Sequence, residues 1–372
     1  MKGYMDSPAP DHGHGPPPTV PDGAVQRLET RDWFKDSGAQ RLARGSNVSY
    51  EEYARRARER HALPATFDDD RVQIELDLDR ILPSLQAFLL GGSAEEEQSE
   101  EQNEATVKSA EYAALVAKLR RILMAYSVRN ARVGYVQGHA DLLCFVLAHT
   151  PLPQSEEQAF WIYATIIERI FPGDFFARSP KLHGFHVDVK VFEELMKQRL
   201  VPHVPQLAER SSTKAANLRF YMTQVDLGFV ASLLACKWFI PVWVSELPRL
   251  LLVELWEAML CEKDGTFLHL LLALHFVRLA CDSLAAKDCT NHFHIQTKHQ
   301  TGHWEASFIY KEVLEACRGL APTVRLATIR QQARAVYNLS DDGVEDWRAN
   351  LRGQAPFLAS ESRALLQGDN YC

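Results

Sequence analysis

The stretch Tyr112–Tyr126, which reads YAALVAKLRRILMAY, decides the fold class. Its apolar side chains recur every three or four residues, so they share one face of a helix, and basic side chains occupy the other face. The apolar positions are Leu115, Val116, Leu119, Ile122, Leu123 and Tyr126, and the basic ones are Lys118, Arg120 and Arg121. This spacing predicts an amphipathic α-helix that packs on a core.

Similar helical patterns continue toward the C-terminus. The predicted helices are Leu142–Ala148, Phe160–Ile170, Val187–Met196, Leu227–Trp238, Leu250–Cys261, Thr266–Ala280 and Trp304–Cys317. Strand-like alternation with hairpin turns is missing from the sequence, and Lys263-Asp264-Gly265 reads as a helix stop. We therefore predict an all-α fold, and a length of 372 residues suits two modest domains or subdomains.

Three stretches interrupt the helical pattern. Residues 1–40 open with a Pro-rich segment that predicts a disordered tail, and residues 93–106 form an acidic run that predicts a loop insertion. Residues 341–372 are polar again, which predicts a C-terminal tail or a final docked helix. Between these stretches, residues 41–190 and 191–340 are the two predicted helical subdomains.

Composition narrows the class of protein. The formal net charge is -7, from 41 Lys and Arg against 48 Asp and Glu, which argues against a nucleic-acid partner. The seven cysteines are scattered and form no CxxC pair, as expected for free thiols in a reducing compartment. No signal-peptide pattern opens the chain, and its apolar runs fall short of the ~20 residues that span a bilayer. We expect a cytoplasmic protein without a transmembrane segment.

The usual catalytic motifs are missing from the sequence. There is no phosphate-binding G-x-x-x-x-G-K-[ST] loop, no G-x-S-x-G elbow and no H-E-x-x-H pair. The nearest approach to a metal site is the cluster of His292, His294, His299 and His303, where Gly302 weakens any helix. We therefore expect no metal site and no cofactor of the chain's own.

Two local patterns remain. In Ile74–Pro83 the side chains of Asp77 and Arg80 are three residues apart, a spacing that predicts an ion pair on one helical turn. Pro83 predicts that Arg80 lies near a helix end, because proline disfavours helix in the residue before it. Taken alone, this pattern is typical of a surface ion pair.

The second pattern is Ala125–Gly138, which reads AYSVRNARVGYVQG. Gly134 and Gly138 enclose Tyr135 and Gln137, so the backbone there can approach another group without Cβ obstruction. Taken alone, Gln137 is interpreted as a residue that caps or bridges nearby backbone groups.

Taken together and in this order, the patterns resemble the TBC domain, the catalytic module of Rab GTPase-activating proteins. Its Ile-x-x-Asp-x-x-Arg motif, followed by Pro, is matched by Ile74, Asp77, Arg80 and Pro83, and its Tyr-x-Gln-Gly motif by Tyr135, Gln137 and Gly138. Further matches are Ala125, Tyr126, Asn130, Val133 and Gly134 upstream, and Lys237-Trp238-Phe239, Leu247-Pro248 and Leu255-Trp256-Glu257 downstream. The resemblance covers roughly Tyr50 to Ala335.

The resemblance implies two packed helical subdomains, with both motifs on the first one, and a partner: a Rab-family small GTPase in its GTP-bound form. It implies that Arg80 is an arginine finger and Gln137 a glutamine finger, both inserted in trans, and that GTP and Mg²⁺ arrive with the partner. The implied supporting residues are Asp77, which would orient Arg80, and Tyr135, Gly134, Gly138 and Asn130 around Gln137. Vesicle trafficking, with recruitment to endomembranes through the partner as an open possibility, would be the cellular setting.

The chain also departs from the family pattern. Ile81 stands where the family commonly has Thr, and His139-Ala140 where it has Met-Asn. The segment that usually reads Arg-Ile-Trp-Asp is Glu254-Leu255-Trp256-Glu257 here, which loses the arginine and lengthens the acid. The first alternative is therefore a catalytically silent TBC-fold scaffold that binds a Rab, and the second is a helical adaptor unrelated to GTPases. Because Arg80 and Gln137 are both present, we favour an activator, with GTP hydrolysed in the partner's own site.

Overall fold

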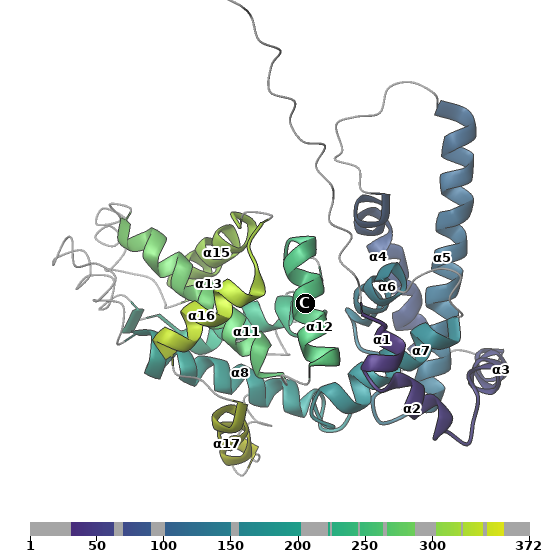
Figure 1. The fold of residues 1–372 in the computed structure, drawn as a ribbon, viewed down its shortest axis with the longest axis horizontal. Helices are drawn as coiled ribbons and strands as arrows, with labels where there is room; N and C mark the ends of the chain where they lie inside the picture. Colours follow the sequence, from purple (N-terminus) through teal and green to yellow (C-terminus); the bar gives the residue numbers. More distant parts are fainter. Residues whose placement is uncertain are drawn as a thin grey trace, which may run out of the picture. The chain divides into compact units, whose positions relative to one another are not determined.

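The computed structural model of the chain describes residues 31–62, 70–90, 101–149, 156–201, 222–223, 225–244, 246–262, 266–286, 303–320, 323–337 and 341–352. Every regular element within these ranges is a helix, so the predicted all-α class is confirmed (Figure 1). The described residues from Asp32 onward belong to one compact unit. The Pro-rich segment, most of the acidic run, the Lys263–Gly265 stop and the histidines at 292, 294 and 299 lie outside the described ranges.

The helices follow one another along the chain and include two π-helical turns, η1 and η2. In order they are α1 (Trp33–Asp36), α2 (Ala39–Arg44), α3 (Tyr50–His61), α4 (Asp70–Leu90), α5 (Glu101–Arg129), α6 (His139–His149), α7 (Glu156–Thr165), η1 (Ile166–Ile170), α8 (His183–Leu195), η2 (Met196–Leu200), α11 (Leu227–Trp238), α12 (Arg249–Cys261), α13 (Phe267–Ala286), α15 (His303–Arg318), α16 (Leu326–Tyr337) and α17 (Asp341–Arg352).

The predicted helices are all present, and α11 matches its predicted range residue for residue. Several others are longer than predicted, because polar residues at their ends complete turns without adding to the apolar pattern. In helix α5 the apolar face predicted from the spacing is the buried one. Leu119, Ile122 and Leu123 are buried, and α5 packs against α3, α4 and α7. The apolar spacing of this stretch therefore predicts correctly which side of α5 packs against its neighbouring helices.

Helix α4 departs from the expectation built on Pro83. It continues through Pro83 to Leu90, so Arg80 lies inside a helix and not near its end. Proline removes one intrahelical hydrogen bond and disfavours the preceding turn, but this local cost is outweighed when tertiary packing fixes the helix. Ile74 and Leu78 supply such packing for the part of the helix before Pro83, because both are buried and α4 contacts α5 and α6.

The predicted boundaries of the tail and the loop also need correction. The ordered part begins before residue 41, since Trp33 of α1 is buried between the rings of Phe145 and Trp256, at centroid distances of 5.8 and 5.9 Å. Helix α5 begins at Glu101, so the expected loop at 93–106 ends earlier than its acidic composition indicated. Both errors arose because composition does not reveal a single buried tryptophan or a helical turn made of polar residues.

The predicted division between residues 190 and 191 falls inside α8. This helix packs on α11, α13 and α17, so it belongs with the C-terminal helices. Residues 341–352 form α17, which contacts α8. The apolar face of α8, with Val187, Val191 and Leu195 buried, explains why the helix is not interrupted at the expected boundary.

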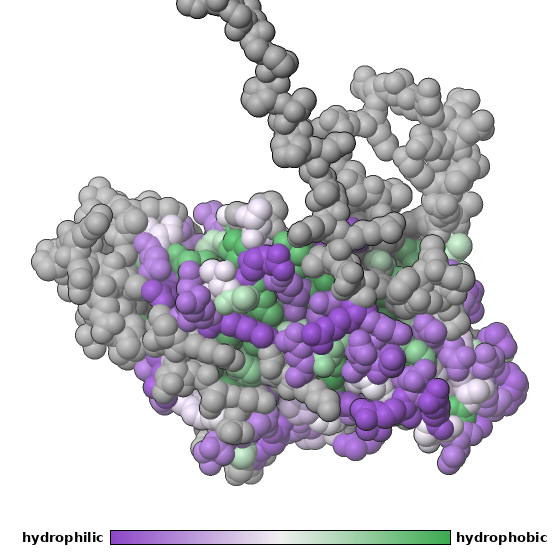
Figure 2. All heavy atoms as spheres, in the orientation of Figure 1, coloured by the Kyte–Doolittle hydropathy of each residue, from purple (hydrophilic) through white to green (hydrophobic). Residues whose placement is uncertain are grey.

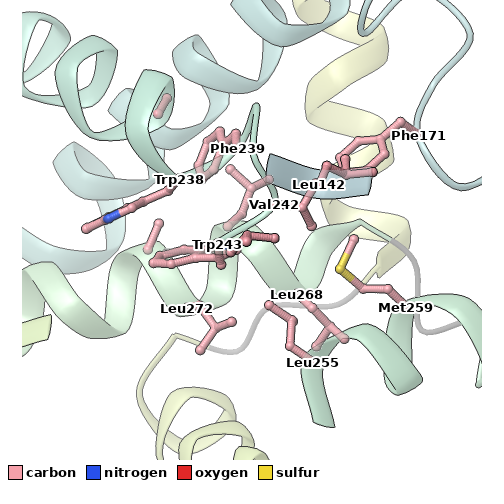
Figure 3. Packing of buried hydrophobic residues seen from close by; sticks show 14 of the residues in the cluster. Leu142, Phe171, Trp238, Phe239, Val242, Trp243, Leu255, Met259, Leu268 and Leu272 are labelled. Carbon is pink, nitrogen blue, oxygen red and sulfur yellow. The ribbon is translucent and has the colours of Figure 1, made fainter. Parts of the chain in front are cut away.

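The C-terminal helices share a core of large side chains. Figure 3 shows Trp243, Leu255 and Leu268 gathered from three segments, and Trp243 stacks on Trp238 with ring centroids 4.5 Å apart. Helix α13 is long and apolar enough to cross a membrane by length and composition, but 78% of its apolar window, Phe267–Leu284, is buried inside the protein. Its apolar character is therefore that of a central core helix.

Candidate functional site

One carboxylate joins the two motifs that the sequence singled out. Asp77 of α4 is buried, and its Oδ2 accepts hydrogen bonds from the hydroxyl of Tyr135 at 2.5 Å and from the backbone N–H of Gly138 at 3.0 Å. A buried carboxylate needs such donors, because an unpaired charge away from water is costly. Asp77 therefore fixes the segment that contains Gln137 against α4.

Arg80 and Gln137 both have exposed side chains. Arg80 lies on α4 about one helical turn after Asp77, and Gln137 directly precedes Gly138. The hydrogen bond from Gly138 to Asp77 therefore keeps the backbone of Gln137 close to the helix that contains Arg80. The ion pair predicted between Asp77 and Arg80 is not formed among the described residues, because the carboxylate points to Tyr135 and Gly138 instead. Arg80 thus extends into solvent from a rigid helix.

The turn before Gln137 is built by the end of α5. The carbonyl of Asn130 accepts hydrogen bonds from the N–H groups of Val133 and Gly134, at 3.1 and 2.8 Å. The Asn130 side-chain amide donates to the hydroxyl of buried Tyr126 at 3.0 Å, which anchors the turn to the core. These contacts connect the upstream motif residues to the position of Gln137.

Gly134 is held in the left-handed region, with φ of 64°. A Cβ at this position would lie 1.7 Å from Nη2 of Arg178 and 2.8 Å from Oδ1 of Asp70. Only glycine fits at this position, because L-residues are disfavoured at positive φ and side-chain atoms of Arg178 and Asp70 already fill the space that a Cβ would need.

Gly134→Ala is expected to lower the free energy of unfolding by at least ~1–2 kcal/mol, the cost of an L-residue at positive φ. Thermal unfolding measures this. Gly173→Ala is the matched control, because no atom lies within 4 Å of the Cβ that would be added there. Equal midpoints for the two variants would contradict the geometry described for Gly134.

Gly138 lies next to the turn that follows the downstream match Lys237-Trp238-Phe239. Its φ is 94°, and a Cβ there would lie 3.3 Å from Cγ2 of Ile240, in the turn that follows α11. In the same turn Val242 and Trp243 have positive φ values of 49° and 66°, conformations that tertiary contacts must hold in place. One such contact is the hydrogen bond from Trp256 Nε1 to the Val242 carbonyl at 3.1 Å.

His139 explains one departure from the family pattern. Its side chain is fully buried, with Nδ1 2.7 Å from the Tyr163 hydroxyl and the ring edge-on to Phe176 at 4.6 Å. Burial lowers the pKa of His139 to about 3, so the ring is neutral at physiological pH. His139 therefore fills a core position behind Gln137 as an aromatic packing residue.

Asp141 lies in the first turn of α6. Burial, together with the charge of Asp77, raises its pKa from 3.8 to about 6. The folded protein thus disfavours the charged form, and this penalty is present above pH 6, shrinks as pH falls through 6, and disappears below the unfolded value.

Asp141→Asn is accordingly expected to stabilise the protein at pH 7.5 by up to about 3 kcal/mol, because each unit of pKa difference corresponds to about 1.4 kcal/mol, and by much less at pH 4.5. Thermal unfolding at the two pH values measures the difference. Asp346→Asn, the same substitution at an exposed position on α17, is the control. A gain for Asp141→Asn that is equal at both pH values would contradict the burial of a charged carboxylate.

Asp70 and Arg178 belong to the same site, although sequence reasoning missed them. Asp70 Oδ1 accepts a hydrogen bond from the Tyr135 N–H at 3.1 Å and forms an ion pair with Arg178. The partners are 65 and 108 residues away from Asp70 in sequence, so no local pattern could have paired them. Among the described residues, no cluster of three or more His, Cys, Asp or Glu side chains could hold a metal ion.

Comparison with known proteins identifies the family. A model of the Rab-GTPase-TBC domain matches residues 46–282, which is more than half of the chain. The chain therefore belongs to the Rab-GTPase-TBC domain family, and the resemblance seen in the sequence motifs is confirmed.

Individual proteins are similar to parts of this chain. The chain is 29% identical over 190 residues to TBC1 domain family member 2A of Bos taurus, and 30% identical over 202 residues to TBC1 domain family member 2B of Xenopus tropicalis. These matches cover 51% and 54% of this chain but only 16% and 17% of the two relatives. A solved structure, the Chlamydomonas flagellar RabGAP TBC domain, is 18% identical, with a TM-score of 0.45 and 78% of each chain covered.

Proposed function

We propose that this protein accelerates GTP hydrolysis by a Rab-type small GTPase in its GTP-bound form, and that it supplies Arg80 and Gln137 in trans. The observation that carries the proposal is the arrangement around Asp77. Its buried carboxylate accepts a hydrogen bond from the N–H of Gly138, the residue after Gln137, and Asp77 itself lies in α4 about one turn before Arg80. Family membership supplies the class of partner.

Each of the two side chains has a distinct role in this proposal. The guanidinium of Arg80 stabilises the negative charge that develops on the transferring γ-phosphoryl group, a contribution worth ~10³–10⁵ in rate among GTPases. The amide of Gln137 orients the attacking water. Positioning and electrostatics suffice for this chemistry, so the chain needs neither a nucleophile nor a metal of its own; the partner brings GTP and Mg²⁺.

The exposed face of α4 also fits a docking role. Leu76 is 46% exposed and is the exposed large hydrophobic residue of the described part of the chain. It lies one helical turn before Arg80, so the two side chains share a face. On the face of the molecule in Figure 2, most coloured atoms are hydrophilic and hydrophobic areas are small. A partner that covers Arg80 would also cover the apolar side chain of Leu76.

Single-turnover GTP hydrolysis across a panel of Rab GTPases tests the proposal. Wild-type protein is expected to accelerate hydrolysis by at least one Rab strongly, and Arg80→Ala together with Gln137→Ala is expected to abolish the gain. A Rab that binds the wild-type protein without faster hydrolysis would favour the silent scaffold instead.

A further inference from the structure

The segment that carries Gln137 is fixed on two sides. Asp77 holds its C-terminal end at Gly138, as described above. At its N-terminal end the N–H of Tyr135 donates to Oδ1 of Asp70, 3.1 Å away, in the first turn of α4. Both carboxylates come from α4, so the helix that presents Arg80 also holds both ends of the Gln137 segment.

Arg178 completes the second attachment. Its guanidinium Nη2 pairs with the same Oδ1 of Asp70, and its backbone N–H donates to the carbonyl of Arg132 at 2.8 Å. A single residue thus contacts the turn before Gly134 through its backbone and the anchoring carboxylate through its side chain. The absence of a Cβ on Gly134 leaves the space that Nη2 occupies.

The exposure of the two partners differs, and the difference matters for their role. The Asp70 side chain is 7% exposed, whereas that of Arg178 is 44% exposed. A buried carboxylate that accepts from a backbone N–H is fixed in place, but a half-exposed arginine contributes little to global stability. Removing Arg178 leaves the buried Asp70 carboxylate with the Tyr135 N–H as its donor, so thermal unfolding of the variant has to accompany the measurement of its effect on the loop.

We propose that Asp70 and Arg178 are positioning residues for the reaction: they hold the segment Gly134–Gly138 so that the Gln137 amide meets the attacking water. This inference rests on the proposed function. Asp70 acts through the backbone N–H of Tyr135, and Arg178 acts through Asp70 and the carbonyl of Arg132. A displacement of about 1 Å at a reacting group is enough to cost ~10²-fold in rate, which sets the scale of the expected effect.

A double-mutant comparison in the full chain tests the inference. Arg178→Ala is expected to lower the maximal rate of Rab-bound GTP hydrolysis up to about 100-fold, with little change in the concentration giving half-maximal rate. In a Gln137→Ala background the same change is expected to cost almost nothing, because the group it positions is gone. Arg178→Lys, which keeps the charge, is expected to restore part of the rate. Arg55→Ala, in an exposed ion pair on α3, is the control.

Hydrogen exchange gives a readout without any GTPase. Amides in the segment Gly134–Gly138 are expected to exchange faster in Arg178→Ala and in Asp70→Ala than in wild type, with the core of α13 unchanged. Wild-type exchange in Arg178→Ala, or a rate loss that adds in full to that of Gln137→Ala, would overturn the inference. If the wild type activates no Rab, the proposed function fails, while the exchange result still decides whether the pair holds the segment.

Discussion

Arg80→Ala is expected to lower the acceleration of GTP hydrolysis by ~10³-fold or more, while leaving the fold and the binding of the GTP-bound partner nearly unchanged. The reason is that Arg80 is exposed and forms no ion pair with Asp77, so its removal disturbs no internal contact described around the site. The loss is confined to charge stabilisation in the transition state, where such an arginine contributes ~10³–10⁵. Single-turnover hydrolysis with a saturating amount of the variant measures this.

Arg80→Lys is the informative companion of Arg80→Ala. Lysine keeps the positive charge but loses the planar fork that contacts two phosphoryl oxygens, so we expect it to restore only a small part of the rate. Circular dichroism and thermal unfolding serve as controls for folding. An Arg80→Ala variant that activates as well as wild type would remove Arg80 from the mechanism, whatever the behaviour of Gln137.

Arg348→Ala is expected to destabilise the protein by about 3–5 kcal/mol, the cost of leaving a buried charge unpaired. Arg348 of α17 is fully buried and donates to both oxygens of Asp188 on α8, at 2.6 Å each, while His269 of α13 contacts the same carboxylate at 2.9 Å. Although burial opposes ionisation, the charge of Arg348 keeps the pKa of Asp188 below its ordinary value. Without Arg348 this carboxylate retains, among the described residues, His269.

Thermal and urea unfolding measure the expected loss. Arg325→Ala is the control, because Arg325 pairs with Glu254 but is 52% exposed, and exposed pairs contribute about 0–1 kcal/mol. Replacing the whole buried pair, by Arg348→Met with Asp188→Leu, is expected to cost less than Arg348→Ala alone, since no unpaired charge remains. Equal losses for Arg348→Ala and Arg325→Ala would contradict the docking of α17 through this ion pair.

Much of the fold was predictable because it depends on local spacing. The apolar period of Tyr112–Tyr126 gave both the helix and its buried face, and the order of motifs gave the family. Helix α17 was ambiguous because its composition is polar, and its attachment includes arginines that meet carboxylates 160 and 178 residues away. No composition or period indicates which of several arginines is buried.

The candidate site was predictable in its motif residues but not in its contacts. Spacing along a helix suggested that Asp77 pairs with Arg80, yet spacing takes no account of donors from another segment. The hydroxyl of Tyr135 and the N–H of Gly138, both half-buried, donate to the Asp77 carboxylate in place of Arg80. Asp70 and Arg178 were missed for the same reason, since they meet only after folding.

The most direct test of the central claim, a glutamine supplied in trans, is single-turnover hydrolysis by a Rab GTPase whose own catalytic glutamine has been replaced. We expect the wild-type protein to accelerate this GTPase still, and Gln137→Ala to lose that acceleration entirely. If the wild type has no effect on such a GTPase, while Gln137→Ala activates the unmodified GTPase normally, then Gln137 does not orient the water and the proposed mechanism is wrong.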